Sequence, residues 1–100
     1  MIKGGCIYII TNKNKTTLYI GVTADLIKRI QEHKNKVYKK RFSVKYNLDQ
    51  LLHYETFHTI DEAILRENEI KKWRRSKKEK LINSKNHSWC DLWEKEVKFW

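Results

Sequence analysis

Two tyrosines are the first residues in this sequence whose type and spacing could do chemistry. Tyr8 lies in the apolar segment CIYII and Tyr19 in LYIG, with a polar segment between them, a pattern that predicts a β-hairpin. With a two-residue loop at Lys13 and Asn14, Tyr8 would lie directly opposite Tyr19, and both phenols would stand on one face of the sheet. The alternative is that the two rings only pack, because tyrosine suits a half-buried strand.

An arginine and a histidine lie on the helix that is predicted to follow the hairpin. Thr23 or Asp25 would cap this helix, which we expect to extend to about Val37. Its apolar residues recur at helical spacing and place His33 on the inward stripe and Arg29 at the border of that stripe. Arg29 is then a functional cation or a surface arginine whose stem packs on the core. His33 is a site residue or a core histidine with a backbone partner.

A carboxylate inside an apolar stripe is the third unusual feature. Glu67 falls three residues after one isoleucine and three before another, in a second predicted helix over residues 61–74. A carboxylate that faces the core is costly unless a cation accompanies it. A salt bridge to Arg29 or Arg66 would meet that need, and so would a metal ion. Glu32, by contrast, is predicted on the outer face of the first helix.

The remaining elements must position these side chains. Residues 48–57 predict a third strand, in which Leu51 and His53 share one face and Leu52 and Tyr54 the other. The last part of the chain is expected to be an irregular tail. Because this tail is rich in tryptophan, it should pack on the domain or on a partner chain.

The charge of the chain favours a polyanionic partner. Its 100 residues suit one domain, 1–100, with 84–100 as the tail, and 22 lysines and arginines against 12 acidic residues give a formal charge of +10. Nucleic acid is the predicted partner, although anionic membranes and acidic proteins attract the same surface. The cations expected to contact nucleic acid lie in the densest basic segments: Lys39, Lys40, Arg41, Lys71, Lys72, Arg74 and Arg75.

The cellular compartment and the role of the cysteines are inferred from motifs that the sequence lacks. No apolar segment approaches the ~20 residues of a membrane span, and no signal peptide is recognisable, so we expect a cytoplasmic protein that does not bind membranes. Cys6 and Cys90 lie at opposite ends of the chain without a C-x-x-C motif. They therefore suggest neither a zinc site nor a disulfide framework.

These residues together resemble the motifs of the GIY-YIG nuclease family. The tripeptide CIY at 6–8 stands at the first motif, and YIG at 19–21 matches the second letter for letter. The segments GVTxDLxxRxxxH at 21–33 and EAIxRExxIKKW at 62–73 look like that family's arginine helix and glutamate helix. The resemblance covers roughly residues 4–90. It is closest to small stand-alone bacterial members, which are similar to the nuclease domain of the nucleotide excision repair incision subunit.

The resemblance implies an α/β (α+β) fold, a GIY-YIG domain with a central three-stranded antiparallel sheet flanked by helices. It also implies hydrolysis of DNA phosphodiester bonds with one divalent cation, Mg²⁺ or Mn²⁺, in DNA repair or recombination. Glu67 would then bind the metal and Arg29 would face the scissile phosphate, where both stabilise developing negative charge. Tyr8 and Tyr19 would orient or deprotonate the attacking water, with Tyr8 favoured as the base. His33 would lie near the phosphate.

Two positions depart from the family pattern. Cys6 replaces the first glycine of the name-giving motif, which is tolerated where the backbone is ordinary β but not where φ is positive. Val22 stands where the excision-repair members carry a lysine. Two other classes stay open: a non-catalytic nucleic-acid binding module, and an accessory protein that docks through its tryptophan-rich end. We expect a monomer without a small-molecule cofactor.

Overall fold

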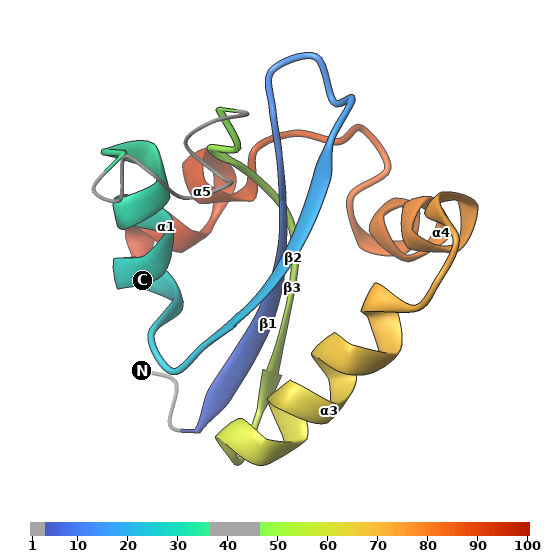
Figure 1. The fold of residues 1–100 in the computed structure, drawn as a ribbon. Helices are drawn as coiled ribbons and strands as arrows, with labels where there is room; N and C mark the ends of the chain where they lie inside the picture. Colours follow the sequence, from blue (N-terminus) through green and yellow to red (C-terminus); the bar gives the residue numbers. More distant parts are fainter. Residues whose placement is uncertain (1–3, 37–46) are drawn as a thin grey trace.

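The computed structural model describes residues 4–36 and 47–100, which form an antiparallel sheet with helices on both faces (Figure 1). The sheet has three strands in the order β2-β1-β3, so the expected α+β fold with a central three-stranded antiparallel sheet is confirmed. The elements in chain order are β1 (Gly5–Thr11), β2 (Leu18–Thr23), α1 (Leu26–Lys34), β3 (Gln50–Phe57), α3 (Ile60–Lys71), α4 (Arg75–Lys85), α5 (Leu92–Lys95) and the 3-10 helix η1 (Val97–Phe99).

The central strand β1 separates two hydrophobic cores. Because neighbouring side chains of a strand point to opposite faces, Cys6, Tyr8 and Ile10 face one core and Ile7 and Ile9 face the other. Helices α1 and α5 cover the first face, and α3 and α4 cover the second (Figure 1). Every residue of β1 is buried, which explains why this strand is almost continuously apolar in the sequence.

The hairpin between β1 and β2 has a longer connection than the sequence pattern suggests. The side chain of Asn12 accepts hydrogen bonds from the backbone N–H groups of Thr16 and Thr17, and Lys15 adopts a φ of 59°. This turn shifts the register, so that Tyr8 pairs with Gly21 and not with Tyr19. The predicted direct pairing of the two tyrosines is therefore wrong. An even shift keeps them on one face, as diagonal neighbours.

Strand β3 carries an irregularity that the alternating pattern does not reveal. The ladder with β1 shifts between Ile9 and Ile10, so that Leu51 pairs with Ile10 while His53 pairs with Ile9. Leu51 therefore faces the core of Tyr8, whereas His53 shares the opposite face with Ile9. The prediction that Leu51 and His53 share a face is wrong, because a bulge adds a residue to one strand and reverses the alternation beyond it.

Two capped helices follow the strands. Asp25 is the N-cap of α1 and accepts from the N–H of Lys28, and the helix is described to Lys34; Val37, its expected end, lies outside the described residues. Thr59 and Glu62 form a reciprocal capping box at the start of α3, which ends at Lys71 and so is shorter than predicted. In the part of the chain that the structure describes, no helix is long and apolar enough to cross a membrane.

The C-terminal segment packs on the domain, which is one of the two expected outcomes, but it does so through short helices and not as a wholly irregular tail. Leu92 of α5 and Val97 of η1 are buried in the core that contains Tyr8. The hydroxyl of Tyr54 donates to Glu96 Oε1 at 2.6 Å, and burial together with this carboxylate raises the pKa of Tyr54 to about 12. Short helices and this partly buried hydrogen bond fix the segment that covers the Tyr8 face.

Candidate active site

Tyr8 and His33 form a buried hydrogen-bonded pair between the central strand and α1. Tyr8 Oη lies 3.1 Å from His33 Nε2, and their ring centroids are 5.6 Å apart. The side chains are almost fully enclosed, since Tyr8 is 1% and His33 7% exposed. Tyr19, on the edge strand β2, places its ring centroid 6.4 Å from that of His33. The structure therefore brings three of the predicted site residues together.

Gly21 makes room for this arrangement. A β-carbon at Gly21 would lie 2.3 Å from both Cζ and Oη of Tyr8, so the phenol occupies the space that any side chain there would need. Tyr8 is paired with Gly21 across the ladder. The ring of Tyr8 lies over Gly21, and its hydroxyl contacts His33. The glycine of the YIG motif is thus required by close packing and not by a positive φ. Sequence reasoning did not identify this role, although an isolated glycine inside a strand is its signal.

Arg29 lies on α1 four residues before His33, so the two side chains are neighbours on the same side of the helix. Its Nε is 3.3 Å from Oε1 of Glu32, and the Arg29 side chain is 30% exposed. The Glu32 side chain is only 15% exposed, so its predicted place on the outer face of the helix is wrong. Arg29 thus combines a half-buried guanidinium with access to solvent, which suits contact with a charged substrate.

Glu67 lies on α3, in the layer on the other face of the sheet. It falls between the buried residues Ala63 and Ile70, and its side chain is 12% exposed. Its carboxylate is 3.3 Å from Nζ of Lys71. Of the alternative partners for Glu67, Arg66 does not form the salt bridge, because it extends to the carboxylate of Glu55 instead.

Arg66 belongs to a separate polar network between β3 and α3. Its Nε lies 2.9 Å from Glu55 Oε1, and it also pairs with Glu69. The buried ring of His53 lies 2.8 Å from the other oxygen of Glu55. The hydrogen bond with His53, followed by the pairing with Arg66, lowers the pKa of Glu55 to about 2. This network satisfies a buried histidine and holds β3 to α3.

The two layers meet at the edge strand β2. A shallow hollow of about 390 Å³ is lined by Leu18, Tyr19 and Ile20 of β2 together with Lys71 and Lys78. The ring of Tyr19 lies near His33 on one face of β2, whereas the side chains of Leu18 and Ile20 face the hollow on the other side. Lys71 is in turn the ion-pair partner of Glu67. The predicted site residues thus lie in two layers, with Tyr8, Tyr19, Arg29 and His33 on one face of the sheet and Glu67 on the other, and not in one enclosed pocket.

The donor set fits a weakly ligated divalent cation. Within the described residues, no group of three or more histidine, cysteine, aspartate or glutamate side chains could hold a metal ion. Mg²⁺ retains several waters and is commonly bound through one or two carboxylates plus substrate phosphates, so a larger cluster is not needed. Glu67, a mostly buried carboxylate with Lys71 beside it, has the chemistry of such a single protein ligand.

The unusual cysteine of the first motif is accommodated without strain. Cys6 is fully buried in β1, and it is not among the described residues with positive φ. Burial, and then the nearby Asp25 charge, raises the pKa of its thiol. Cys6 therefore acts as a small core residue in ordinary β conformation, where glycine is not required.

The basic residues predicted to contact nucleic acid fall into different settings. Lys39, Lys40 and Arg41 lie outside the described residues, whereas Lys72 and Arg74 are exposed. Lys71 is paired with Glu67 and borders the hollow.

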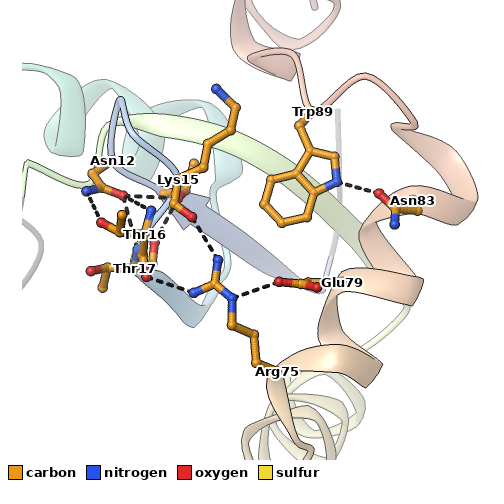
Figure 2. A network of polar contacts seen from close by, with 9 residues as sticks. Asn12, Lys15, Thr16, Thr17, Arg75, Glu79, Asn83 and Trp89 are labelled. Carbon is orange, nitrogen blue, oxygen red and sulfur yellow. Dashed lines mark hydrogen bonds and ion pairs between the residues drawn. The ribbon is translucent and has the colours of Figure 1, made fainter.

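Arg75 has a different role from its neighbours (Figure 2). Its guanidinium donates to the backbone carbonyls of Lys15 and Thr16, each at 2.7 Å, and to Glu79 at 2.8 Å. This side chain therefore ties α4 to the hairpin turn.

Comparison with known proteins gives the family. The model of the GIY-YIG catalytic domain matches residues 4–80. The UPF0213 protein SSP2268 of Staphylococcus saprophyticus is 42% identical over 77 residues, which cover 77% of this chain and 92% of that protein. The UPF0213 protein HQ_3675A of Haloquadratum walsbyi is 36% identical over 75 residues, covering 75% of this chain and 82% of that protein. No solved structure matches the chain significantly.

The matched region spans all the elements that build the site. It contains the hairpin with Tyr8, Tyr19 and Gly21, helix α1 with His33, and helix α3 with Glu67. The structure and the family model thus agree on the same part of the chain. This chain belongs to the GIY-YIG family.

Proposed function

We propose that this protein is a DNA endonuclease that hydrolyses phosphodiester bonds with the help of one divalent metal ion, Mg²⁺ or Mn²⁺. The observation that carries the proposal is the Tyr8–His33 hydrogen bond over Gly21, next to Tyr19, inside the region that the catalytic-domain model matches. A purely structural hairpin has no need for a phenol and an imidazole that are buried against each other. Membership of a nuclease-type family supports the same reading.

The two tyrosines differ in burial, and this difference gives them different roles. Tyr8 is 1% exposed, so its hydroxyl is placed to hold His33 and not to meet bulk water. Tyr19 lies half-buried on the edge strand with its ring near His33, so its hydroxyl is the one that reaches an attacking water. A phenol with an ordinary pKa near ~10 is a weak base at neutral pH, so nearby positive charge must favour its ionised form. We therefore assign Tyr19 to the water and Tyr8 to the positioning of His33.

The charged residues act on the phosphate. Arg29 keeps its charge at every working pH and can pair with phosphate oxygens as negative charge develops in the transition state. Glu67 would hold the cation together with water and a substrate oxygen. When bound, the cation supplies Lewis-acid stabilisation of the phosphoryl oxygens. Lys71 is paired with Glu67 and would pair with the phosphate if that carboxylate held the cation instead.

A cleavage assay tests the proposal. Purified protein is incubated with supercoiled, branched and single-stranded DNA, with Mg²⁺ or Mn²⁺ and with excess chelator. We expect cleavage with metal only, and a loss of at least about a hundredfold in Glu67→Gln, Arg29→Ala and Tyr19→Phe. Glu94→Gln, a substitution at an exposed carboxylate of α5, is the control and should cleave like wild type. Faster cleavage of branched DNA would favour a place in repair or recombination.

A non-catalytic nucleic-acid binding module is the second candidate. The formal charge of +10 and the valine in place of lysine at position 22 are the observations that favour it. Such a module would bind DNA with a strong salt dependence and leave it intact. No cleavage of any of the three DNAs, with binding retained in Glu67→Gln and Arg29→Ala, would establish the module and overturn the nuclease.

A further inference from the structure

The hollow beside β2 combines an apolar floor with a basic rim. Leu18, Tyr19 and Ile20 belong to the edge strand, and Lys71 and Lys78 belong to α3 and α4. Its volume of about 390 Å³ lies in the range of small ligand sites. An apolar surface bordered by two ammonium groups suits a ligand that has both a flat or apolar part and a negative charge.

Lys78 is the unexplained member of this set. Its side chain is half-buried, and within residues 4–36 and 47–100 it makes no ion pair. The neighbouring cations on α4 differ, because Lys77 lies 4.3 Å above the ring of Trp73 and Arg75 pairs with Glu79. Lys78 lines the hollow, and no acidic side chain of the described residues lines it, so a bound anion in the hollow would pair with the ammonium of Lys78.

The position of Lys78 is fixed by the clamp between α4 and the hairpin. Arg75 donates to the carbonyls of Lys15 and Thr16, which lie just before β2 (Figure 2). Lys78 follows Arg75 by three residues, so both side chains lie on the same side of α4. The clamp therefore holds Lys78 beside the start of β2, where Tyr19 lies. The hydrogen bonds of Arg75 therefore fix the position of one side of the hollow relative to β2.

We propose that this hollow is a subsite for one nucleotide of the DNA strand, next to the phosphate that is cut. Lys78, together with Lys71, pairs with the phosphate of that nucleotide. The apolar surface of Leu18 and Ile20 contacts its sugar and base, a mode of contact that tolerates any sequence. The position of the subsite relative to the cut rests on the proposed nuclease function. The binding of a nucleotide phosphate by Lys78 does not.

Binding of a short single-stranded oligonucleotide tests the subsite without cleavage. A fluorescein-labelled thymidine oligonucleotide is titrated by anisotropy over a range of salt concentrations, with chelator present. We expect Lys78→Gln to weaken binding and to reduce the slope of log Kd against log salt by roughly 0.7, the loss of one phosphate contact on a single strand. Lys78→Arg, which keeps the charge, should retain most of the affinity. Lys80→Gln, at an exposed lysine two residues further on α4, is the matched control.

The contacts in the hollow are checked by NMR with a probe that fills only one subsite. Adding the dinucleotide of thymidine to labelled protein should shift the amide signals of Leu18, Tyr19 and Ile20 in wild type, and these shifts should disappear in Lys78→Gln. Equal slopes for Lys78→Gln and Lys80→Gln, or unchanged shifts in Lys78→Gln, would overturn the subsite even if the protein cuts DNA. A slope change without any cleavage would support the subsite and count against the nuclease alone.

Discussion

The phenol of Tyr8 lies over Gly21, its partner in the β1–β2 ladder, and occupies the space of the missing side chain. This contact lets Oη of Tyr8 reach Nε2 of His33 at 3.1 Å from a fully buried position. The two tyrosines of the hairpin thus have unequal surroundings, because Tyr19 pairs with Ile10 at the edge and Tyr8 is enclosed. A glycine in one strand therefore determines which phenol is held by the core and which one meets solvent.

Replacing Gly21 by alanine should disturb the site through Tyr8. The new β-carbon would lie 2.3 Å from two atoms of the ring, and a fixed strand opposite leaves the phenol little room to move. We expect the free energy of unfolding, measured with urea, to fall by about 1–3 kcal/mol. DNA cleavage should fall strongly.

A double-mutant cycle isolates this contact. In a Tyr8→Ala background the clash partner is gone, so Gly21→Ala should cost much less than in wild type. An equal cost in both backgrounds would mean that the glycine is needed for some reason other than the phenol.

The sequence predicts the layers of this fold because its periodicities are strong. The continuous apolar segment of β1 and the helical spacing of Leu26, Ile30 and His33 are both realised in the structure. The register of the hairpin was not predictable in the same way. Its turn depends on hydrogen bonds of a single asparagine side chain, Asn12, and on a positive φ at Lys15. A one-dimensional pattern specifies which residues face the core and leaves the length of a turn undetermined.

Contacts between elements that are distant in the sequence also could not be predicted from the sequence. The bulge in β3 and the cover of α5 and η1 over Tyr54 depend on partners more than forty residues away in the chain. Lys78 looks like any other cation of its basic segment, and only the hollow beside β2 distinguishes it. The types of the candidate site residues were visible in the sequence, whereas the division into buried and open positions required the structure.

Removing the hydroxyl of Tyr8 should separate positioning from packing. Tyr8→Phe keeps the ring over Gly21 and removes the hydroxyl that is hydrogen-bonded to His33. We expect the free energy of unfolding to fall by about 1 kcal/mol, because His33 Nε2 is left buried without this partner. Cleavage should fall much more than stability if His33 must be held in one orientation. The two quantities are measured by urea unfolding and by initial rates at saturating DNA.

The outcome of Tyr8→Phe is compared with that of Tyr19→Phe. Tyr19 is half-buried, so the loss of its hydroxyl should change the free energy of unfolding little while cleavage is lost. If the Tyr8→Phe variant cleaves DNA like wild type, the hydroxyl of Tyr8 has no role in cleavage and Tyr8 is only a core residue.

The Glu55 network should make the stability of the protein depend on pH between 4.5 and about 2. The pKa of Glu55 is lowered from 4.5 to about 2, first by the hydrogen bond with His53 and then by Arg66. A lowered carboxyl pKa contributes stability that is fully present above pH 4.5 and is lost as the pH falls toward 2. The contribution is on the order of 2–3 kcal/mol. Urea unfolding between pH 7 and pH 2 measures it.

Glu55→Gln should remove most of this pH dependence. The variant should be less stable than wild type at pH 7, and the difference should shrink as the pH approaches 2. Glu69→Gln is the control, because Glu69 pairs with the same Arg66 but is largely exposed. If Glu55→Gln and wild type keep a constant difference across the range, the carboxylate of Glu55 is not the group that titrates.

Arg75 and Arg74 are adjacent in the sequence but should behave differently. Arg75→Ala removes two hydrogen bonds to the carbonyls of Lys15 and Thr16, so we expect the free energy of unfolding to fall by about 1–2 kcal/mol. Arg74 makes no side-chain cap at the start of α4 and is exposed, so Arg74→Ala should leave stability unchanged. Urea unfolding measures both effects, and amide hydrogen exchange at Thr17 reports on the turn.

The Arg75→Lys variant separates the role of the clamp from direct contact of Arg75 with nucleic acid. Arg75→Lys keeps the charge but cannot donate to two carbonyls and a carboxylate in the fixed geometry of a guanidinium, so it should not restore stability. Because the clamp places Lys78, oligonucleotide affinity should fall in Arg75→Lys together with protection of Thr17. If Arg75→Lys binds and unfolds like wild type, charge alone accounts for Arg75, and the hollow does not depend on a rigid α4.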